Sequence, residues 1–213
     1  MRILPILFLS TTLATGPALA GPVSFSSGWN EQRLSLFRSN DYRFGDQLGI
    51  VSDGAVSLAW KPLPRSEWAA RSAFWSWRVD ESVPATDLGR KGGDDRNISL
   101  YFVFLPEAEA NALEGANIRQ LMGNDAVRIL QYVWGGNHGR DEIIGSPYAP
   151  GQGVTVALRQ AGTGAFNEDV DLAADFRRAF GGEAGSLVGL AVSADSDDTE
   201  TAIRAAIGGL TLR

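Results

Sequence analysis

The chain has 213 residues, a formal net charge of −6, no cysteine and one histidine. The absence of cysteine excludes disulfides, a lipid-modified N-terminal cysteine, cysteine-based zinc sites and a cysteine nucleophile, and one histidine is too few for a histidine-rich zinc centre. An acidic balance with no block of Lys or Arg argues against nucleic acid and anionic membrane surfaces as partners.

Residues 1–20 have the pattern of a signal peptide. Arg2 supplies the positive start, residues 3–13 form a short apolar core, and Ala18-Leu19-Ala20 is a cleavage sequence of the A-x-A type. This apolar run is too short to cross a membrane, and no later segment approaches the ~20 apolar residues of a spanning helix. We therefore expect cleavage before Gly21, no membrane insertion afterwards, and a periplasmic or secreted protein, which also suits a chain without disulfides.

The rest of the chain mainly predicts short strands. Alternation of apolar and polar residues is clearest over residues 72–80, where Trp75, Trp77 and Val79 share one face. The run 98–105 is apolar on both faces, which is typical of a central buried strand. Further strands are predicted over residues 33–38, 48–51, 55–63, 127–134, 154–159, 165–170, 186–194 and 206–212.

Two helical segments interrupt the strands. Residues 106–122 carry Pro, Glu and Ala at their start, as helix N-termini do. In the second segment, Leu172, Phe176 and Phe180 form an apolar stripe at helical spacing. The pair Gly181-Gly182 then predicts the end of this helix.

The number and spacing of the strands predict the fold class. Roughly eight to ten strands at this spacing are typical of an all-β sandwich. A strand-rich chain of this length must bury two sheet faces without leaving long edges, which a double-sheet jelly roll achieves. We therefore expect a single domain over residues 21–213, a jelly-roll-like β-sandwich of two antiparallel sheets with one or two short helical insertions.

Several motifs, taken in chain order, resemble those of a known family. They are Phe74-Trp75-Ser76-Trp77-Arg78-Val79, Gly93-Asp94-Asp95-Arg96 leading into Tyr101-Phe102-Val103-Phe104, Tyr132-Val133-Trp134, Asp175-Phe176-Arg177-Arg178-Ala179-Phe180-Gly181, and Val192-Ser193-Ala194-Asp195-Ser196-Asp197-Asp198-Thr199 running into Ala206-Ile207-Gly208-Gly209-Leu210. Together they resemble a bacterial exported family catalogued as domain of unknown function 3047. The resemblance covers nearly the whole mature chain and implies a β-sandwich of carbohydrate-binding type, without implying catalytic residues.

The chain departs from the pattern of that family at two places. It has Asp198 where the family tends to have Asn, and Gly208-Gly209 where the family tends to have Gly-Asp. If the second acidic position is a ligand in the family, this member lacks it.

Aromatic, Arg and acidic residues recur in a set that could form a polar, aromatic-lined site on a sheet. The residues we expect to bind a ligand are Arg78, Asp94, Asp95, Tyr132, Trp134, Asp195 and Asp197. Tyr132 and Trp134 share a strand face and could stack on a sugar ring, while the carboxylates would orient hydroxyl groups. The alternative is that the aromatic rings fill the core and the Asp94-Asp95 pair makes turn hydrogen bonds.

Three carboxylates, Asp195, Asp197 and Asp198, follow a predicted strand within four residues. Hard oxygen ligands of this kind suit calcium, so these residues are a candidate metal site, alone or with Asp94 or Asp95. The sequence is not an EF-hand loop, because its sixth position is Glu instead of Gly and its twelfth is Ala instead of Glu. The alternative is that Asp197 or Asp198 caps a short helical turn.

No catalytic signature names a reaction. His138, the single histidine, lies in a Gly-rich loop without a G-x-S-x-G elbow. It could be an ordinary loop residue; in a polysaccharide lyase, His138 or a Tyr would be the base, with Arg140 neutralising a uronate. The sequence favours a non-catalytic carbohydrate- or glycan-binding module of the cell envelope. The alternatives are a polysaccharide lyase or glycoside hydrolase acting on envelope polysaccharide, and a structural or interaction protein.

Overall fold

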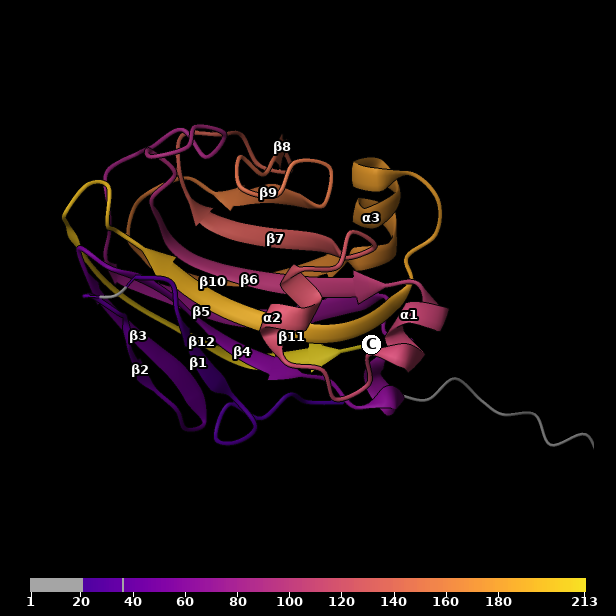
Figure 1. Ribbon diagram of the computed structural model, residues 1–213. Helices are drawn as coiled ribbons and strands as arrows, with labels where there is room; N and C mark the ends of the chain where they lie inside the picture. The colour runs from indigo at the N-terminus through magenta and orange to yellow at the C-terminus, as the bar shows by residue number, and fades with distance from the viewer. Residues whose placement is uncertain (1–20, 36) are drawn as a thin grey trace, which may run out of the picture.

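A computed structural model describes residues 21–35 and 37–213 as two β-sheets packed face to face (Figure 1). This arrangement confirms the predicted all-β sandwich with short helical insertions. The predicted signal peptide lies outside the described residues. None of the helices in the described part of the chain has the length and apolar character needed to cross a bilayer.

The larger sheet has seven strands in the order β1-β4-β11-β6-β7-β9-β8. Its strands are β1 (Asn30–Arg33), β4 (Val56–Pro62), β11 (Ser186–Asp195), β6 (Arg96–Leu105), β7 (Arg128–Gly135), β9 (Gly153–Arg159) and β8 (Ile143–Gly145). The strands are paired antiparallel, except that β7 and β9 run parallel. This pair corrects the expectation of two purely antiparallel sheets. A parallel pair needs a long connection, and residues 136–152, which include β8, provide it.

The smaller sheet has five strands in the order β10-β5-β12-β3-β2, all paired antiparallel. Its strands are β10 (Gly164–Asp171), β5 (Ser72–Glu81), β12 (Ala202–Leu212), β3 (Gln47–Asp53) and β2 (Asp41–Arg43). Most predicted strands are present within a few residues of their expected bounds. The strand predicted over residues 33–38 is wrong, since β1 ends at Arg33. The short strands β2 and β8 were not predicted.

The helices are short and lie outside the two layers (Figure 1). They are the 3-10 helix η1 (Arg65–Glu67), α1 (Glu107–Ala112), α2 (Ile118–Met122) and α3 (Leu172–Phe180). The segment 106–122 forms two helices instead of the single one predicted, because Gly115 has a φ of +77°, which ends helical geometry between them. Helix α3 has the predicted bounds, and Asp171 caps its start by accepting a hydrogen bond from the Ala174 N–H at 2.9 Å.

The main core lies between the sheets and is rich in aromatic rings. Trp75 and Trp77 of β5 face Tyr132 and Trp134 of β7, with ring centroids 5.7 Å apart for Trp75 and Tyr132 and 5.8 Å apart for Trp77 and Trp134. All four residues are buried. Helix α3 closes one end of this core, where the Phe176 ring packs against a ring of β6. Buried aromatic rings supply large apolar contact areas, so this core holds the sandwich together without disulfides.

A second, smaller apolar cluster lies on the outer face of the seven-stranded sheet. Helices α1 and α2 cover this face over β6 and β11 (Figure 1). Trp60 of β4 and Val103 of β6 pack there with Ala110 of α1 and Leu121 of α2. The larger sheet therefore has apolar side chains on both faces, and the outer face is only partly filled.

Candidate functional site

A cavity of about 430 Å³ lies on the outer face of the seven-stranded sheet. Its floor comes from outward-facing side chains of β4, β11, β6 and β7, and its walls include α2 and residues 146–148. Strand alternation decides which side chains reach this face. In β6, Leu100 and Phe102 point into the main core, so Tyr101 and Val103 point outward to the cavity.

The cavity has an apolar part and a polar end. The apolar part is lined by Leu58, Trp60, Val103, Ile118, Leu121, Met122, Val127, Ile129 and Ala191. Leu34 and Val56 add apolar surface beside the polar end, where Val56 lies opposite Asp195 in the pairing of β4 with β11. The polar end is lined by Asp94, Arg96, Tyr101, Gln131, Ser146, Tyr148, Thr155, Asp195 and Asp197. The lining thus combines a broad apolar wall with a few convergent polar groups, as small-molecule sites do.

Arg96 is the centre of the polar end. It lies opposite Asp195 in the pairing of β6 with β11, and its Nη1 atom is 2.9 Å from both Asp94 Oδ2 and Asp195 Oδ2. Its Nε atom donates to Ser99 Oγ at 3.0 Å and its Nη2 atom to Tyr101 Oη at 3.2 Å. Only 11% of the Arg96 side chain is exposed. One fixed, buried cation therefore holds two carboxylates and two hydroxyl groups at one end of the cavity.

The groups around Arg96 keep its guanidinium positively charged. Burial by itself lowers the pKa of the Arg96 guanidinium, but Tyr101, Asp195 and Asp94 outweigh burial and place that pKa above its ordinary value. Arg96 is therefore a permanent positive charge in this site.

A row of uncharged polar side chains continues from Arg96 across the sheet. Gln131 of β7 donates from Nε2 to Ser99 Oγ at 3.0 Å and to Tyr101 Oη at 3.1 Å. Tyr101 Oη also shares a hydrogen bond of 2.9 Å with Ser193 Oγ of β11. Thr155 of β9 donates to Gln131 Oε1 at 3.3 Å. Such a network fixes the rotamers of its members, so the polar end is preorganised.

Asp195 is incompletely satisfied within this network. Its Oδ2 atom meets Arg96, but its Oδ1 atom is buried and has no hydrogen-bond partner among the described residues. Burial, with Asp197 and Asp95 nearby, raises the pKa of the Asp195 carboxyl to about 8, although Arg96 acts in the opposite direction. One guanidinium faces two carboxyl groups, so the Asp195 carboxyl holds its proton more tightly than a free aspartate does. A buried polar atom without a partner is unfavourable and marks a place that a ligand could satisfy.

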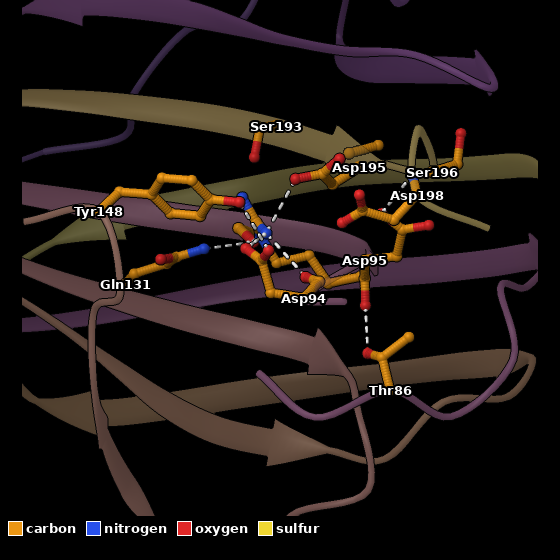
Figure 2. Close-up of polar contacts among 12 residues, drawn as sticks. Thr86, Asp94, Asp95, Gln131, Tyr148, Ser193, Asp195, Ser196 and Asp198 are labelled. Atoms are coloured by element: carbon orange, nitrogen blue, oxygen red, sulfur yellow. Dashed lines mark hydrogen bonds and ion pairs between the residues drawn. The ribbon is translucent and has the colours of Figure 1, made fainter. Parts of the chain in front are cut away.

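Tyr148 lies over the polar end from the segment that precedes β9 (Figure 2). Its hydroxyl donates to Asp94 Oδ1 at 3.0 Å, so Asp94 is held between Arg96 and this ring. The Tyr148 side chain is largely exposed, and Lys91 Nζ lies 5.0 Å from the centre of its ring. The ring therefore forms a rim that a ligand entering the cavity would meet.

The acidic residues after β11 do not all lie where the sequence suggested. Asp95, Asp197 and Asp198 each place one carboxylate oxygen within 4.8 Å of the others, whereas Asp195 pairs with Arg96. Asp95 is fully buried and accepts hydrogen bonds from the Thr199 N–H at 2.7 Å and the Thr199 hydroxyl at 2.5 Å. It also accepts from the Asp198 N–H at 3.3 Å. Asp95 thus holds the distant 198–199 turn, instead of bonding the backbone of its own turn as the alternative interpretation of the Asp94-Asp95 pair expected.

Four residues of the expected ligand-binding set are outside the cavity lining: Asp95, described above, and Arg78, Tyr132 and Trp134. Tyr132 and Trp134 are buried between the sheets, on the opposite face of β7 from Gln131. This corrects the expected stacking platform, because strand alternation points both rings into the core. Tyr132 donates to Asp175 Oδ2 at 2.7 Å. Arg78 is exposed on the outer face of the five-stranded sheet and pairs with Asp80 at 3.1 Å.

His138 and Arg140, considered above for lyase chemistry, also lie outside the cavity lining. The His138 Nδ1 atom is 3.0 Å from Glu142 Oε1, and its Nε2 atom accepts from the Leu88 N–H at 3.1 Å. Arg140 Nη2 is 3.1 Å from Glu168 Oε2, a buried carboxylate. Both side chains are therefore engaged in contacts within the protein, and neither faces the cavity.

The structure brings together several residues that sequence reasoning missed. They are Trp60, Arg96, Tyr101, Gln131, Tyr148 and Ser193. Ser99 and Tyr101 interrupt an otherwise apolar run in β6, and this was the available signal, because a strand buried on both faces has little reason to carry polar side chains. Gln131 and Tyr148 had no such signal, since each is polar in a segment where polar residues are ordinary.

Among solved structures, the chain is similar to the xyloglucanase domain of NopAA, a type three effector from Sinorhizobium fredii, solved in complex with cellobiose. The two share 7% sequence identity, the match covers 91% of this chain and 95% of that chain, and the TM-score is 0.44. A likeness at this level carries no argument about what the present chain does. No curated protein matches the chain.

The family of the chain follows from a match over nearly its whole described length. The family described as "Protein of unknown function (DUF3047)" matches residues 27–211, a span that runs from just before β1 almost to the end of β12 and holds every cavity-lining residue named above. The fold and the residues of the polar end are therefore those of a member of this family: the chain belongs to DUF3047.

Proposed function

We propose that the protein binds a carbohydrate ligand in the cavity, with the sugar at the polar end around Arg96. The observation that carries the proposal is the buried Oδ1 atom of Asp195, which lacks a partner among the described residues in a residue that lines the cavity. A ligand hydroxyl donating to this carboxyl, or accepting from it, would satisfy an atom that the protein leaves unsatisfied.

The mixture of donors and acceptors at the polar end supports a hydroxylated ligand. Asp94, Asp195 and Asp197 offer carboxyl oxygens, while the Arg96 guanidinium offers N–H donors. A sugar hydroxyl both donates and accepts, so it can bridge such a set. Hydrogen bonds to charged partners are roughly twice as strong as neutral ones, which favours recognition by these side chains.

Aromatic residues of the cavity support the same conclusion. Tyr101 and Tyr148 line its polar end from β6 and the segment before β9. Sugar rings carry apolar C–H faces that pack against aromatic rings. The stacking surface expected from Tyr132 and Trp134 would thus be provided by other aromatic residues, on the outer face of the sheet.

Binding to a panel of oligosaccharides, measured by titration calorimetry on the wild-type protein and two variants, tests the proposal. Asp195→Asn keeps the shape of the side chain but changes its hydrogen bonding, and it should weaken binding at least about tenfold, or about 1.4 kcal/mol. Asp80→Asn is the matched control on the exposed face of the other sheet, and it should bind like the wild type. Equal affinities for the wild type and Asp195→Asn, or no binding by any sugar in the panel, would overturn the proposal.

Glycoside hydrolysis is a second candidate function, favoured by one observation. A pKa of about 8 leaves the Asp195 carboxyl protonated at neutral pH, which is the state a general acid needs, and Asp94 lies across the same Arg96 nitrogen. Release of nitrophenol from 4-nitrophenyl glycosides, abolished by Asp195→Asn, is the expected result for an enzyme. Sugar binding without any release would leave the binding function alone.

We also propose export to the periplasm or the medium, supported by the signal-peptide pattern of residues 1–20. Mass spectrometry of the protein purified from periplasm and medium should find Gly21 as the N-terminal residue. An uncleaved protein in the cytoplasmic fraction would contradict this proposal.

A further inference from the structure

We propose that the ligand is amphiphilic, with a hydroxylated sugar head at the Arg96 end and an alkyl chain along the apolar part of the cavity. This inference rests on the proposed function, because it takes the sugar head from it and adds the chain. It follows from the composition of the cavity, in which the polar residues gather at one end.

The apolar part of the cavity extends over several elements. Its floor comes from three neighbouring strands, through Leu58 of β4, Ala191 of β11 and Val103 of β6, and Leu121 and Met122 of α2 form a wall. The apolar lining thus continues from the sheet to the helix that covers it. A ligand that is a sugar alone would leave this apolar surface in contact with water, which is unfavourable.

An open apolar cavity in a closely packed protein favours a ligand that fills it. Protein interiors are packed as densely as organic crystals, and a cavity next to large side chains removes stabilising contacts. About 430 Å³ stays open on this face of the sheet. The space is within the range of small-molecule sites.

The rim of the cavity points to an apolar ligand as well. Leu34 and Met122 line the cavity and are 50% and 58% exposed. Met122 follows the buried Leu121 in α2, so the exposed apolar surface is continuous with the interior on this side of the cavity. A contiguous apolar surface of this kind marks a ligand-binding groove in soluble proteins.

Trp60 gives the apolar part a flat floor. Its ring lies so close to Gly189 of β11 that a Cβ atom at position 189 would overlap it. Gly189 therefore allows the ring to lie against the neighbouring strand instead of standing up into the cavity. The ring borders both the cavity and the smaller apolar cluster under α1 and α2, where it can contact an alkyl chain along its length.

The polar end fixes which part of the amphiphile lies where. Arg96, Asp94 and Asp195 are buried and hydrogen-bonded at one end, so an alkyl chain placed there would remove hydrogen-bonding partners without replacing them, which is costly. A sugar head meets those groups and leaves the chain against Trp60 and α2. This charge and hydrogen-bond complementarity is the reason for choosing an alkyl glycoside over a fatty acid, whose carboxylate would face Asp94 and Asp195.

Titration calorimetry with alkyl glycosides of increasing chain length tests the inference. The probes are glucose, maltose and the methyl, butyl, hexyl and octyl β-glucosides and β-maltosides, each below its micelle concentration, with 1-butanol and 1-hexanol as chains without a head. Each methylene buried along the cavity should improve affinity about fourfold. The gain should stop at the chain length that fills the cavity.

Two variants connect the chain-length effect to the cavity. Met122→Gln changes an exposed rim residue of the cavity, and it should reduce the gain per methylene while the affinity for the free sugar stays within twofold. Phe37→Gln is the matched control, since Phe37 is 93% exposed and does not line the cavity. It should bind every probe like the wild type.

The outcomes separate this inference from the proposed function. Binding of the free sugar with no gain from the alkyl chain would overturn the amphiphile and leave carbohydrate binding in place. Alkanols that bind as tightly as the glycosides of the same chain length would overturn both, because the head would then contribute nothing. No binding by any glucoside or maltoside would also overturn both. An unchanged chain-length gain in Met122→Gln would place the chain elsewhere and overturn the inference.

Discussion

The inner and outer faces of the seven-stranded sheet differ although the same strands build them. On the inner face, Leu100 and Tyr132 are fully buried in a close-packed aromatic core. On the outer face, the next residues, Tyr101 and Gln131, line a cavity and belong to a polar network around Arg96. Alternation along each strand separates two environments by a single residue.

The comparison shows how one sheet can provide stability and a binding site together. The inner face gains stability from apolar burial, which depends on area and packing and tolerates no open space. The outer face is not closely packed over the cavity, and its hydrogen bonds fix the positions of polar side chains. Substitutions on the inner face should therefore affect unfolding, and those at the polar end should affect both unfolding and binding.

The largest expected fall in the free energy of unfolding comes from removing an aromatic ring of the inner face. Trp134→Ala removes a buried side chain that packs against Trp77 and Phe166, and the free energy of unfolding should fall by about 3 to 5 kcal/mol. Urea denaturation followed by circular dichroism measures this change. A Trp134→Ala protein that keeps its stability and loses only sugar binding would show that the ring belongs to the binding site after all.

A slightly smaller loss is expected from removing the cation of the outer face. Arg96→Met leaves the carboxyl groups of Asp94 and Asp195 without their charged partner in a buried setting, and the free energy of unfolding should fall by about 3 kcal/mol. Adding Asp195→Asn to Arg96→Met should recover part of the loss. If the double variant is as unstable as the sum of two independent losses, Arg96 and Asp195 are not coupled as described.

The smallest expected effect is a pH dependence of the free energy of unfolding that comes from Asp195 on the outer face. Because the pKa of Asp195 is raised from 3.8 to about 8, the folded protein holds a proton that the unfolded chain has released between these pH values. The free energy of unfolding should therefore fall as pH rises across this window, and Asp195→Asn should remove this part of the dependence. The stability of the variant relative to the wild type should rise by about 1 to 3 kcal/mol from pH 4 to pH 8.

Urea denaturation at several pH values measures that difference. Asp80→Asn, on the exposed face of the other sheet, should follow the wild type at every pH. A difference between Asp195→Asn and the wild type that stays constant with pH would mean that the Asp195 carboxyl titrates like a free aspartate.

Local sequence patterns were sufficient for most of the elements and for the family. The alternation over residues 72–80 and the stripe of Leu172, Phe176 and Phe180 predicted β5 and α3 because both patterns depend on neighbours within one element. The motif series also led to the right family. The single predicted helix over 106–122 failed where a local feature, the positive φ of Gly115, was not recognised.

The sequence by itself determined the β-sandwich, since strand periodicity and apolar content leave few other ways to bury two sheets. Only the tertiary structure decided which face of each strand lies inside, because alternation is symmetric and does not say which set of side chains meets the second sheet. That choice put Tyr132 and Trp134 in the core and made the polar end of the cavity from Arg96 and its partners. Those partners are brought together by strand order, with β11 between β4 and β6, which no local pattern encodes.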